Sequence, residues 1–149
     1  MTGNLFHKAI IGTMPYLPRG LVWRFSRRYI AGTSLADAYR AVQALNDIGC
    51  TGTIDVLGED ITNAEQVAAA LALYREALDG IRDARLDCGI SVKLSELGLR
   101  IDEDGCRGAM HELLDSTRDH DNFVRIDMED SSVTDVTLDI YPEMRRDYE

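Results

Sequence analysis

The sequence predicts an α/β protein built as a partial (βα)8 barrel: its first three βα units, preceded by N-terminal helices. Three short runs rich in apolar and β-branched residues alternate with longer segments of helical periodicity, as in parallel strands joined by helical crossovers. Each run also has one apolar and one charged face, whereas a parallel sheet covered by helices on both sides is apolar on both. A barrel accounts for this difference, because its strands pack one face against outer helices and turn the other inward.

The N-terminal 50 residues are expected to form a helical lead-in, and residues 51–149 the first part of the barrel. Residues 18–28 combine four arginines with large apolar side chains, among them Trp23. Such a basic amphipathic helix either packs on the domain through Trp23, which we favour, or touches an anionic membrane surface. The apolar run that precedes it is too short to span a membrane.

Each expected helix starts with side chains that suit a first turn. Ser34, Thr62 and Ser132 each stand three residues before a carboxylate, as in a capping box, and a start near residues 102–104 relies on acidic residues alone. Apolar residues then recur with a period close to 3.6, which predicts amphipathic helices. One stripe follows Ser34 and another follows Thr62: Leu35, Ala38, Tyr39, Val42, Leu45 and Ile48, then Ala64, Val67, Ala68, Leu71, Tyr74, Leu78 and Ile81.

The three expected strands are TIDVL (residues 53–57), ISVKLS (90–95) and FVRIDM (123–128). Successive side chains on a strand point to opposite faces, so the charged residues share the face opposite the apolar ones. They also stand late in their strands. A barrel would therefore bring Asp55, Lys93, Arg125 and Asp127 together at its C-terminal mouth, where the active sites of such barrels lie.

The pattern alone leaves two readings of Lys93 and Asp127 open, a structural ion pair or a catalytic role. The desolvation cost of a buried pair favours function slightly. Glu59 and Glu96 lie beyond the strand ends and are expected to be solvated, and His111 is expected to be exposed on a helix. The glycines match no phosphate-binding motif, and the histidines form no metal-binding pattern.

The chain is acidic, with a formal net charge of −10. A phosphate backbone would be repelled, so nucleic acid is not expected as a partner. Cys50, Cys88 and Cys106 are odd in number and lack the spacing of a metal site, which indicates free thiols in a reducing setting. We expect a cytoplasmic location, with a peripheral position at the inner face of the cell membrane as the alternative.

Three motifs in register resemble the N-terminal half of proline dehydrogenase of the bacterial single-function type: IDVLGE (54–59), SVKLSELGL (91–99) and NFVRIDMEDS (122–131). The preceding RRYIAGTSLADA is similar to the lead-in helix of that family, so the match runs from about residue 27 onward. The resemblance implies a distorted β/α barrel that holds FAD. It also implies oxidation of L-proline to 1-pyrroline-5-carboxylate, the first step of proline catabolism, with the electrons passed through the flavin to a quinone, often at the membrane.

The same resemblance implies roles for four residues. Lys93 matches the lysine that binds the substrate carboxylate, and Asp127 matches an active-site aspartate, taken here as catalytic. Met128 matches the residue that abuts the flavin. Asp55 matches an aspartate of the polar floor that binds substrate. In this scheme the cofactor carries the chemistry, while the protein binds and orients.

The sequence departs from a whole barrel in length, since such barrels typically need about 250 residues and eight strands. We therefore expect a fragment that is inactive alone, because most flavin contacts and the arginines that complete the carboxylate clamp belong to the family's other half. An open sheet would also leave a raw edge and exposed apolar surface, which predicts poor solubility or self-association.

Two rival functions remain at this point. A lysine-dependent aldolase of the same fold would use Lys93 as a Schiff-base nucleophile, with Asp127 shuttling protons. The other rival is a non-catalytic remnant that only binds or assembles.

Overall fold

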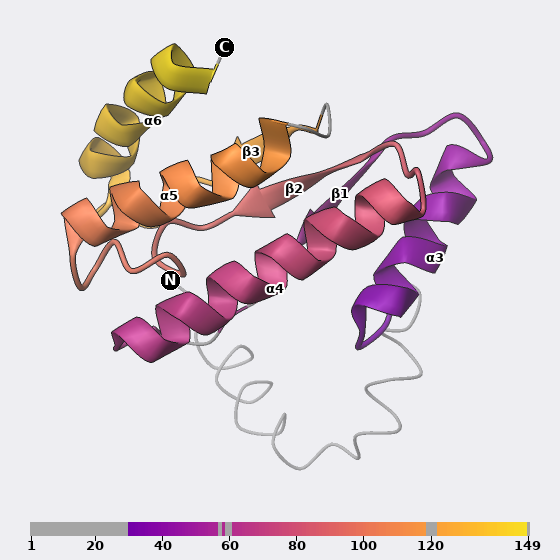
Figure 1. Ribbon diagram of the computed structural model, residues 1–149, viewed down its shortest axis with the longest axis horizontal. Helices are drawn as coiled ribbons and strands as arrows, with labels where there is room; N and C mark the ends of the chain where they lie inside the picture. Colours follow the sequence, from indigo (N-terminus) through magenta and orange to yellow (C-terminus); the bar gives the residue numbers. More distant parts are fainter. Residues whose placement is uncertain (1–29, 57, 59–60, 119–121, 149) are drawn as a thin grey trace, which may run out of the picture.

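The computed structural model describes residues 30–56, 58, 61–118 and 122–148. The basic segment at residues 18–28 and Glu59 lie outside the described residues. The elements follow in the order α3 (Leu35–Asn46), β1 (Gly52–Asp55), α4 (Ala64–Asp83), β2 (Cys88–Val92), α5 (Glu103–Thr117), β3 (Val124–Ile126) and α6 (Thr134–Tyr148) (Figure 1).

The three strands form one parallel sheet in the order β1-β2-β3, as the alternation of strands and helices predicted. Ile54 pairs with Ile90, and Ile90 pairs with Val124. β2 begins two residues earlier than expected and ends at Val92, because the chain then turns, with the Glu96 amide donating to the Lys93 carbonyl at 3.0 Å. Asp55 therefore ends β1, and Lys93 and Asp127 directly follow β2 and β3, whereas Arg125 lies in the middle of β3.

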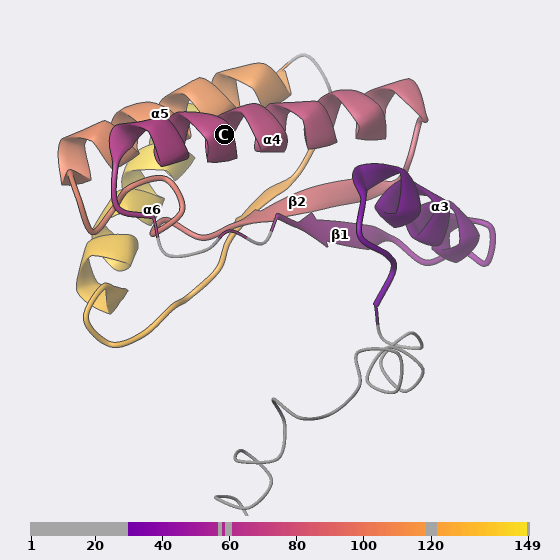
Figure 2. The same cartoon turned by 90° about the horizontal axis from the view of Figure 1, so that it is seen from below.

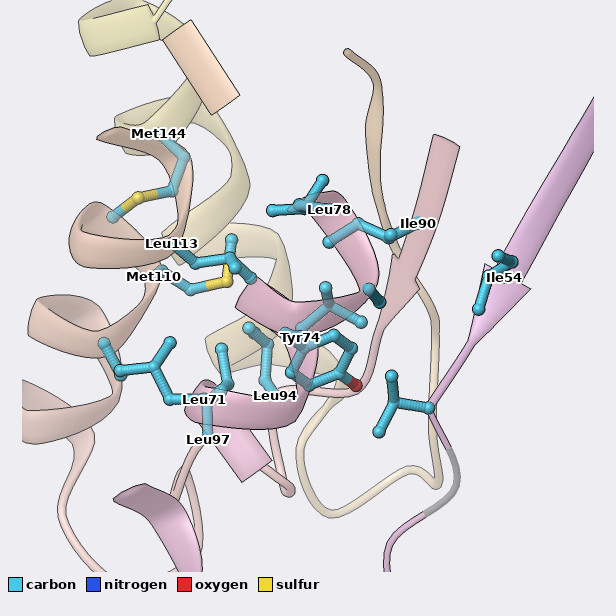
Figure 3. Close-up of a cluster of buried hydrophobic side chains, with 14 of the residues drawn as sticks. Ile54, Leu71, Tyr74, Leu78, Ile90, Leu94, Leu97, Met110, Leu113 and Met144 are labelled. Atoms are coloured by element: carbon cyan, nitrogen blue, oxygen red, sulfur yellow. The ribbon is translucent and has the colours of Figure 1, made fainter. Parts of the chain in front are cut away.

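The core lies between the sheet and the helices α4 and α5, which run along one face of the strands (Figure 2). Its largest fully buried side chains come from the helices, from β2 and from the turn after it: Tyr74, Leu78, Ile90, Leu94, Leu97, Met110 and Leu113, which Figure 3 shows, and Ile140. Fully burying a side chain of this size contributes roughly 1.5–3 kcal/mol, so this cluster is the main source of stability.

The predicted apolar stripes are confirmed in part on both α4 and α3. On α4, Leu71, Tyr74, Leu78 and Ile81 are buried, but Ala64 and Ala68 at the start of the stripe are exposed. On α3 the buried residue is Val42. It packs against Gly52 of β1, which has no side chain to keep the helix away. Leu45 and Ile48 are 42% and 73% exposed, so the prediction was wrong for the last turn of the stripe, which reaches beyond the packed part of the helix.

Two of the predicted helix starts are confirmed and one is shifted. Ser34 caps α3 by accepting from the amide three residues on, and Asp102 is the N-cap of α5. At α4 the cap is Asn63, not Thr62. Asn63 Oδ1 accepts from the backbone amide of Gln66 at 3.0 Å, and Gln66 Oε1 accepts from the backbone amide of Thr62 at 2.8 Å. The arrangement resembles a capping box, but the side chain of Gln66 reaches the residue before the cap.

The three cysteines have the state that the sequence predicted, whereas His111 does not. Cys50, Cys88 and Cys106 are free, and burial raises the pKa of Cys88 to about 11 and that of Cys106 to about 12. His111 was expected to be exposed but is half-buried between α5 and α6, where its Nδ1 lies 3.1 Å from the Tyr148 hydroxyl. Within the described ranges, no helix has the length and apolarity needed to cross a membrane.

Candidate active site

Charged side chains from three different strands meet at the C-terminal edge of the sheet. Asp55 is the last residue of β1, Lys93 directly follows β2, and Asp127 directly follows β3. The backbones that follow β2 and β3 stay aligned beyond the last paired residues, because the Asp127 amide donates to the Val92 carbonyl at 2.9 Å. The sequence placed these residues at one mouth, and the structure brings them together.

Lys93 pairs mainly with Asp55. Its Nζ donates to Asp55 Oδ1 at 2.8 Å and Oδ2 at 2.7 Å, while the nearest oxygen of Asp127 is 4.0 Å away. The sequence interpretation in which Lys93 and Asp127 form an ion pair was therefore wrong about the residue nearest to Lys93, which is Asp55. The side chains of Lys93 and Asp55 are 27% and 36% exposed, so the pair is neither buried nor free in solvent and is accessible to a ligand.

Lys93 stays charged in this setting. Burial alone would lower its pKa, but the hydrogen bonds and the charge of Asp55, with the charges of Glu96 and Asp127, outweigh burial and raise the pKa. The result is a fixed ammonium at neutral pH, suited to holding an anionic group.

Arg125 holds Asp127 from the other side. Its Nε donates to Asp127 Oδ1 at 2.9 Å and to the hydroxyl of the buried Ser91 at 3.2 Å. The pKa of Asp127 is lowered, first by a hydrogen bond from Ser91 and then by Arg125 and Lys93, against the opposing effect of burial. Asp127 is therefore an ionised carboxylate with a constrained position.

Glu96 is the main residue that sequence reasoning missed. It was expected to be solvated, yet it is only 5% exposed. Its Oε2 accepts from the Tyr74 hydroxyl at 2.6 Å and its Oε1 from the Gly58 amide at 2.7 Å. Burial, and then the hydrogen bond to Glu96, raises the pKa of Tyr74. This carboxylate ties the segment after β1 to the segment after β2.

A second set of contacts ties the segment after β2 to the segment after β3. Glu129 accepts from the amide of Ser95 at 3.0 Å and also from its hydroxyl. Arg100 donates to Ser132 at 3.0 Å and pairs with Asp130. Hydrogen bonds from Ser132, followed by Arg100, lower the pKa of Asp130 to about 2.

Ser132 was predicted to cap the last helix, and this was wrong. Its hydroxyl donates to Asp130 Oδ1 at 2.5 Å, and the helix α6 starts two residues later. The turn that Asp130 and Ser132 form replaces the expected cap, because the carboxylate two residues earlier is the closer acceptor.

Lys93 lines a cavity of about 530 Å³, within the usual size range of ligand pockets, whereas its partners Asp55 and Asp127 are not among the lining residues. The residues that line this cavity come from all three segments that follow the strands: Gly58, Ile61, Thr62, Lys93, Ser95, Glu96, Arg100, Glu129 and Asp130. A larger hollow of about 610 Å³ lies beside β3 between α5 and α6, and its lining is mostly apolar. We place the candidate site at the smaller cavity, because Lys93 and the buried Glu96 face it.

Met128 lies next to Asp127 and is 54% exposed, so its thioether is available to an apolar ligand face. Among the residues that the structure describes, no group of three or more histidines, cysteines or carboxylates is arranged to hold a metal ion.

The comparisons with known proteins agree on one family. The family model described as proline dehydrogenase matches residues 38–149. Proline dehydrogenase 1 of Bacillus subtilis subsp. natto is 32% identical over 124 residues, which cover 83% of this chain and 41% of that protein. The proline dehydrogenase of Deinococcus radiodurans is 29% identical over 147 residues, covering 93% of this chain and 47% of that protein.

A solved structure shares the fold. The crystal structure of proline utilization A (PutA) from Bdellovibrio bacteriovorus, inactivated by N-propargylglycine, superposes with a TM-score of 0.70 at 21% identity, over 77% of this chain and 14% of that one. The chain thus spans less than half the length of the curated relatives it matches. On the extent of the family match, the chain belongs to the proline dehydrogenase family.

Proposed function

We propose that this chain supplies part of the active site of a proline dehydrogenase, an oxidoreductase of proline catabolism. In this function L-proline is oxidised to 1-pyrroline-5-carboxylate with FAD as cofactor, and the electrons pass to a quinone. The observation that carries the proposal is the charged Lys93 fixed at the strand ends beside Asp127. Family membership supports the same reading.

Lys93, Asp127 and Asp55, here called the charged row, have different roles in binding. The Lys93 ammonium holds the substrate carboxylate through charge-assisted hydrogen bonds. Asp127, ionised and fixed by Arg125, faces the positive ring nitrogen of proline and orients the ring, which is the catalytic contribution we assign to it. Asp55 holds Lys93 in place. Positioning of this kind is what the protein contributes when a cofactor carries the chemistry.

The described residues fit a flavin at one point. Met128, exposed beside Asp127, offers a polarizable apolar contact for a flat ring at the place where the substrate would lie. A bound FAD supplies the acceptor for the hydride that leaves the proline ring. A cytoplasmic location, with a peripheral position at the inner face of the cell membrane as the alternative, belongs to the same proposal.

We also propose that the three βα units form the first part of a (βα)8 barrel, with residues 51–149 in that part and residues 1–50 as the lead-in. The parallel order of the strands and the gathering of charges at their C-terminal ends support this. The likeness to PutA in fold supports it as well.

A chimera tests the function directly. The segment of Bacillus subtilis proline dehydrogenase 1 that aligns with this chain is replaced by this chain, and the visible spectrum of the purified protein with FAD is recorded before and after L-proline is added. We expect a flavin band that bleaches with proline, and Lys93→Met should raise the proline concentration needed for half-maximal bleaching. A chimera that binds FAD but is not reduced by proline would contradict the proposal and favour a non-catalytic remnant.

The lysine-dependent aldolase is not retained as a second candidate. A Schiff-base lysine needs a lowered pKa to attack a carbonyl. Lys93 instead has a raised pKa and donates to both oxygens of Asp55. Borohydride trapping of a carbonyl compound on Lys93 would reverse this conclusion.

A further inference from the structure

We propose that Glu96 is a positioning residue of the candidate active site. It holds the segment after β1, at Gly58, against the turn that carries Lys93, and it thereby controls how well the cavity that these residues line binds its ligand. The effect on ligand binding rests on the proposed function, because L-proline is taken from it as the ligand. The hold on Gly58 does not depend on that function.

Glu96 joins three parts of the chain that lie far apart in the sequence. Its Oε1 accepts from the Gly58 amide at 2.7 Å, and its Oε2 accepts from the Tyr74 hydroxyl at 2.6 Å. Its own backbone amide donates to the Lys93 carbonyl at 3.0 Å. One residue therefore connects the segment after β1, the helix α4 and the turn after β2.

Tyr74 gives this junction a rigid base. Its side chain is fully buried among the apolar side chains of the core (Figure 3), where close packing restricts its movement. Burial, and then Glu96, raises the pKa of Tyr74, while a hydrogen bond from the Lys93 backbone opposes the rise. The hydroxyl therefore contacts Glu96 and also the backbone that carries the ammonium group.

The contacts of Glu96 suit a positioning role rather than direct contact with a ligand. Glu96, Gly58 and Lys93 all line the cavity of about 530 Å³, yet Glu96 is only 5% exposed and each of its carboxylate oxygens already has a donor. A Cβ at position 58 would lie 3.2 Å from Glu96 Oε1, so the glycine lets the two segments approach this closely. Glu96 thus fixes the spacing of two walls of the cavity.

Hydrogen exchange of the ¹⁵N-labelled chain tests the hold on Gly58. This amide lies in an exposed segment, so its protection depends on Glu96, and we expect exchange at least about tenfold faster in Glu96→Ala than in the wild type. Glu96→Gln keeps an oxygen for the Gly58 amide and should restore most of the protection. The matched control is Glu129→Ala, which removes the carboxylate bonded to the Ser95 amide and should leave exchange at Gly58 unchanged.

The chimera with Bacillus subtilis proline dehydrogenase 1 tests the effect on ligand binding. Because Lys93 would lose its fixed position, Glu96→Ala should raise the KM for L-proline about tenfold and change kcat less than about threefold. Glu96→Gln should keep the KM within about threefold of the wild type. A purely structural loss would instead lower the amount of active protein, and thus the apparent kcat, at unchanged KM. Glu112→Ala, which removes an exposed carboxylate paired with Arg75, should change neither constant.

Several results would overturn the inference. Unchanged exchange at Gly58 or an unchanged KM in Glu96→Ala would do so, as would equal effects in the control variants or effects that Glu96→Gln does not reduce. Should Glu96→Ala not fold, the double variant Tyr74→Phe/Glu96→Met replaces it, because it removes the buried hydroxyl together with its acceptor. Failure of both to fold would assign Glu96 to stability alone.

The two proposals fail separately. A wild-type chimera that binds FAD but is not reduced by L-proline contradicts the proposed function. In that case the inference about Glu96 is decided by hydrogen exchange alone. Faster exchange of the Gly58 amide in Glu96→Ala supports it, and unchanged exchange overturns it.

Discussion

Removing one hydroxyl from the core by Tyr74→Phe should destabilise the protein measurably. Tyr74 is fully buried and its hydroxyl donates to the nearly buried Glu96 at 2.6 Å. Hydrogen bonds to charged groups contribute roughly 1.5–3 kcal/mol, and the short distance is typical of a charge-assisted bond. Because phenylalanine fills the same space, the apolar packing is kept, and we expect a loss of about 2 kcal/mol in the free energy of unfolding.

Urea unfolding followed by circular dichroism measures this loss as a shift of the midpoint at constant slope. Tyr39→Phe is the matched control, since its hydroxyl donates at 3.1 Å to a neutral backbone carbonyl in a more exposed place. That control should lose about 1 kcal/mol or less. If Tyr74→Phe costs no more than Tyr39→Phe, the charged hydrogen bond to Glu96 is not the stabilising contact described above.

The same pair predicts a pH dependence. Burial, and then Glu96, raises the pKa of Tyr74 above its usual value of 10.0. A group with a raised pKa in the folded state gives stability that is complete below the unfolded pKa and is lost as the pH rises beyond it. The wild type should therefore lose stability more steeply above pH 10.0 than Tyr74→Phe does. Parallel curves for the two proteins would contradict this.

Three further predictions follow from the strand ends and the sheet. Asp55→Asn should lower the pKa of Lys93, because the hydrogen bonds and charge of Asp55 outweigh burial; an NMR titration of the lysine side chain that shows no change would argue against it. Asp130 has a pKa of about 2 against an ordinary 3.8, so its stabilising effect is present above the ordinary value and is lost as the pH falls toward 2. Asp130→Asn should flatten that acid limb in urea unfolding, and an unaltered limb would contradict the assignment. Gly89→Ala should cost roughly 1–3 kcal/mol, because its Cβ would lie 2.5 Å from a backbone oxygen of the adjacent segment. Gly108→Ala, in open space on α5, should instead stabilise by up to about 1 kcal/mol, and thermal unfolding in which both variants behave alike would refute the distinction.

Much of the fold could be predicted because it depends on periodicity. A period near 3.6 identified the buried side of α4, and alternation identified the apolar faces of the strands. The same reasoning failed for Leu45 and Ile48 on α3, which are exposed. Periodicity shows which side of a helix is apolar. How many turns of that side are buried depends on the elements that pack against it, which lie elsewhere in the chain.

The candidate site was predictable only in outline. Charges late in parallel strands must meet, so the meeting of Lys93 with the two aspartates followed from the pattern. The choice of Asp55 over Asp127 as close partner depends on side-chain reach, which no pattern contains. Glu96 was missed because its two partners are 22 and 38 positions away. One signal was present: Tyr74 stands inside an apolar stripe, and a buried tyrosine needs an acceptor for its hydroxyl.

The charged row has a consequence for how such a protein can change over time. Asp55, Lys93 and Asp127 come from three consecutive strand–helix units, one from each, and the parallel ladder brings them to the same edge of the sheet. Residues gained or lost at the far ends of the helices leave the row in place, whereas a one-residue slip in a strand turns its charge to the opposite face. The architecture is therefore modular. Each strand–helix unit can vary in length at the far end of its helix and still place one charged residue at the shared edge of the sheet.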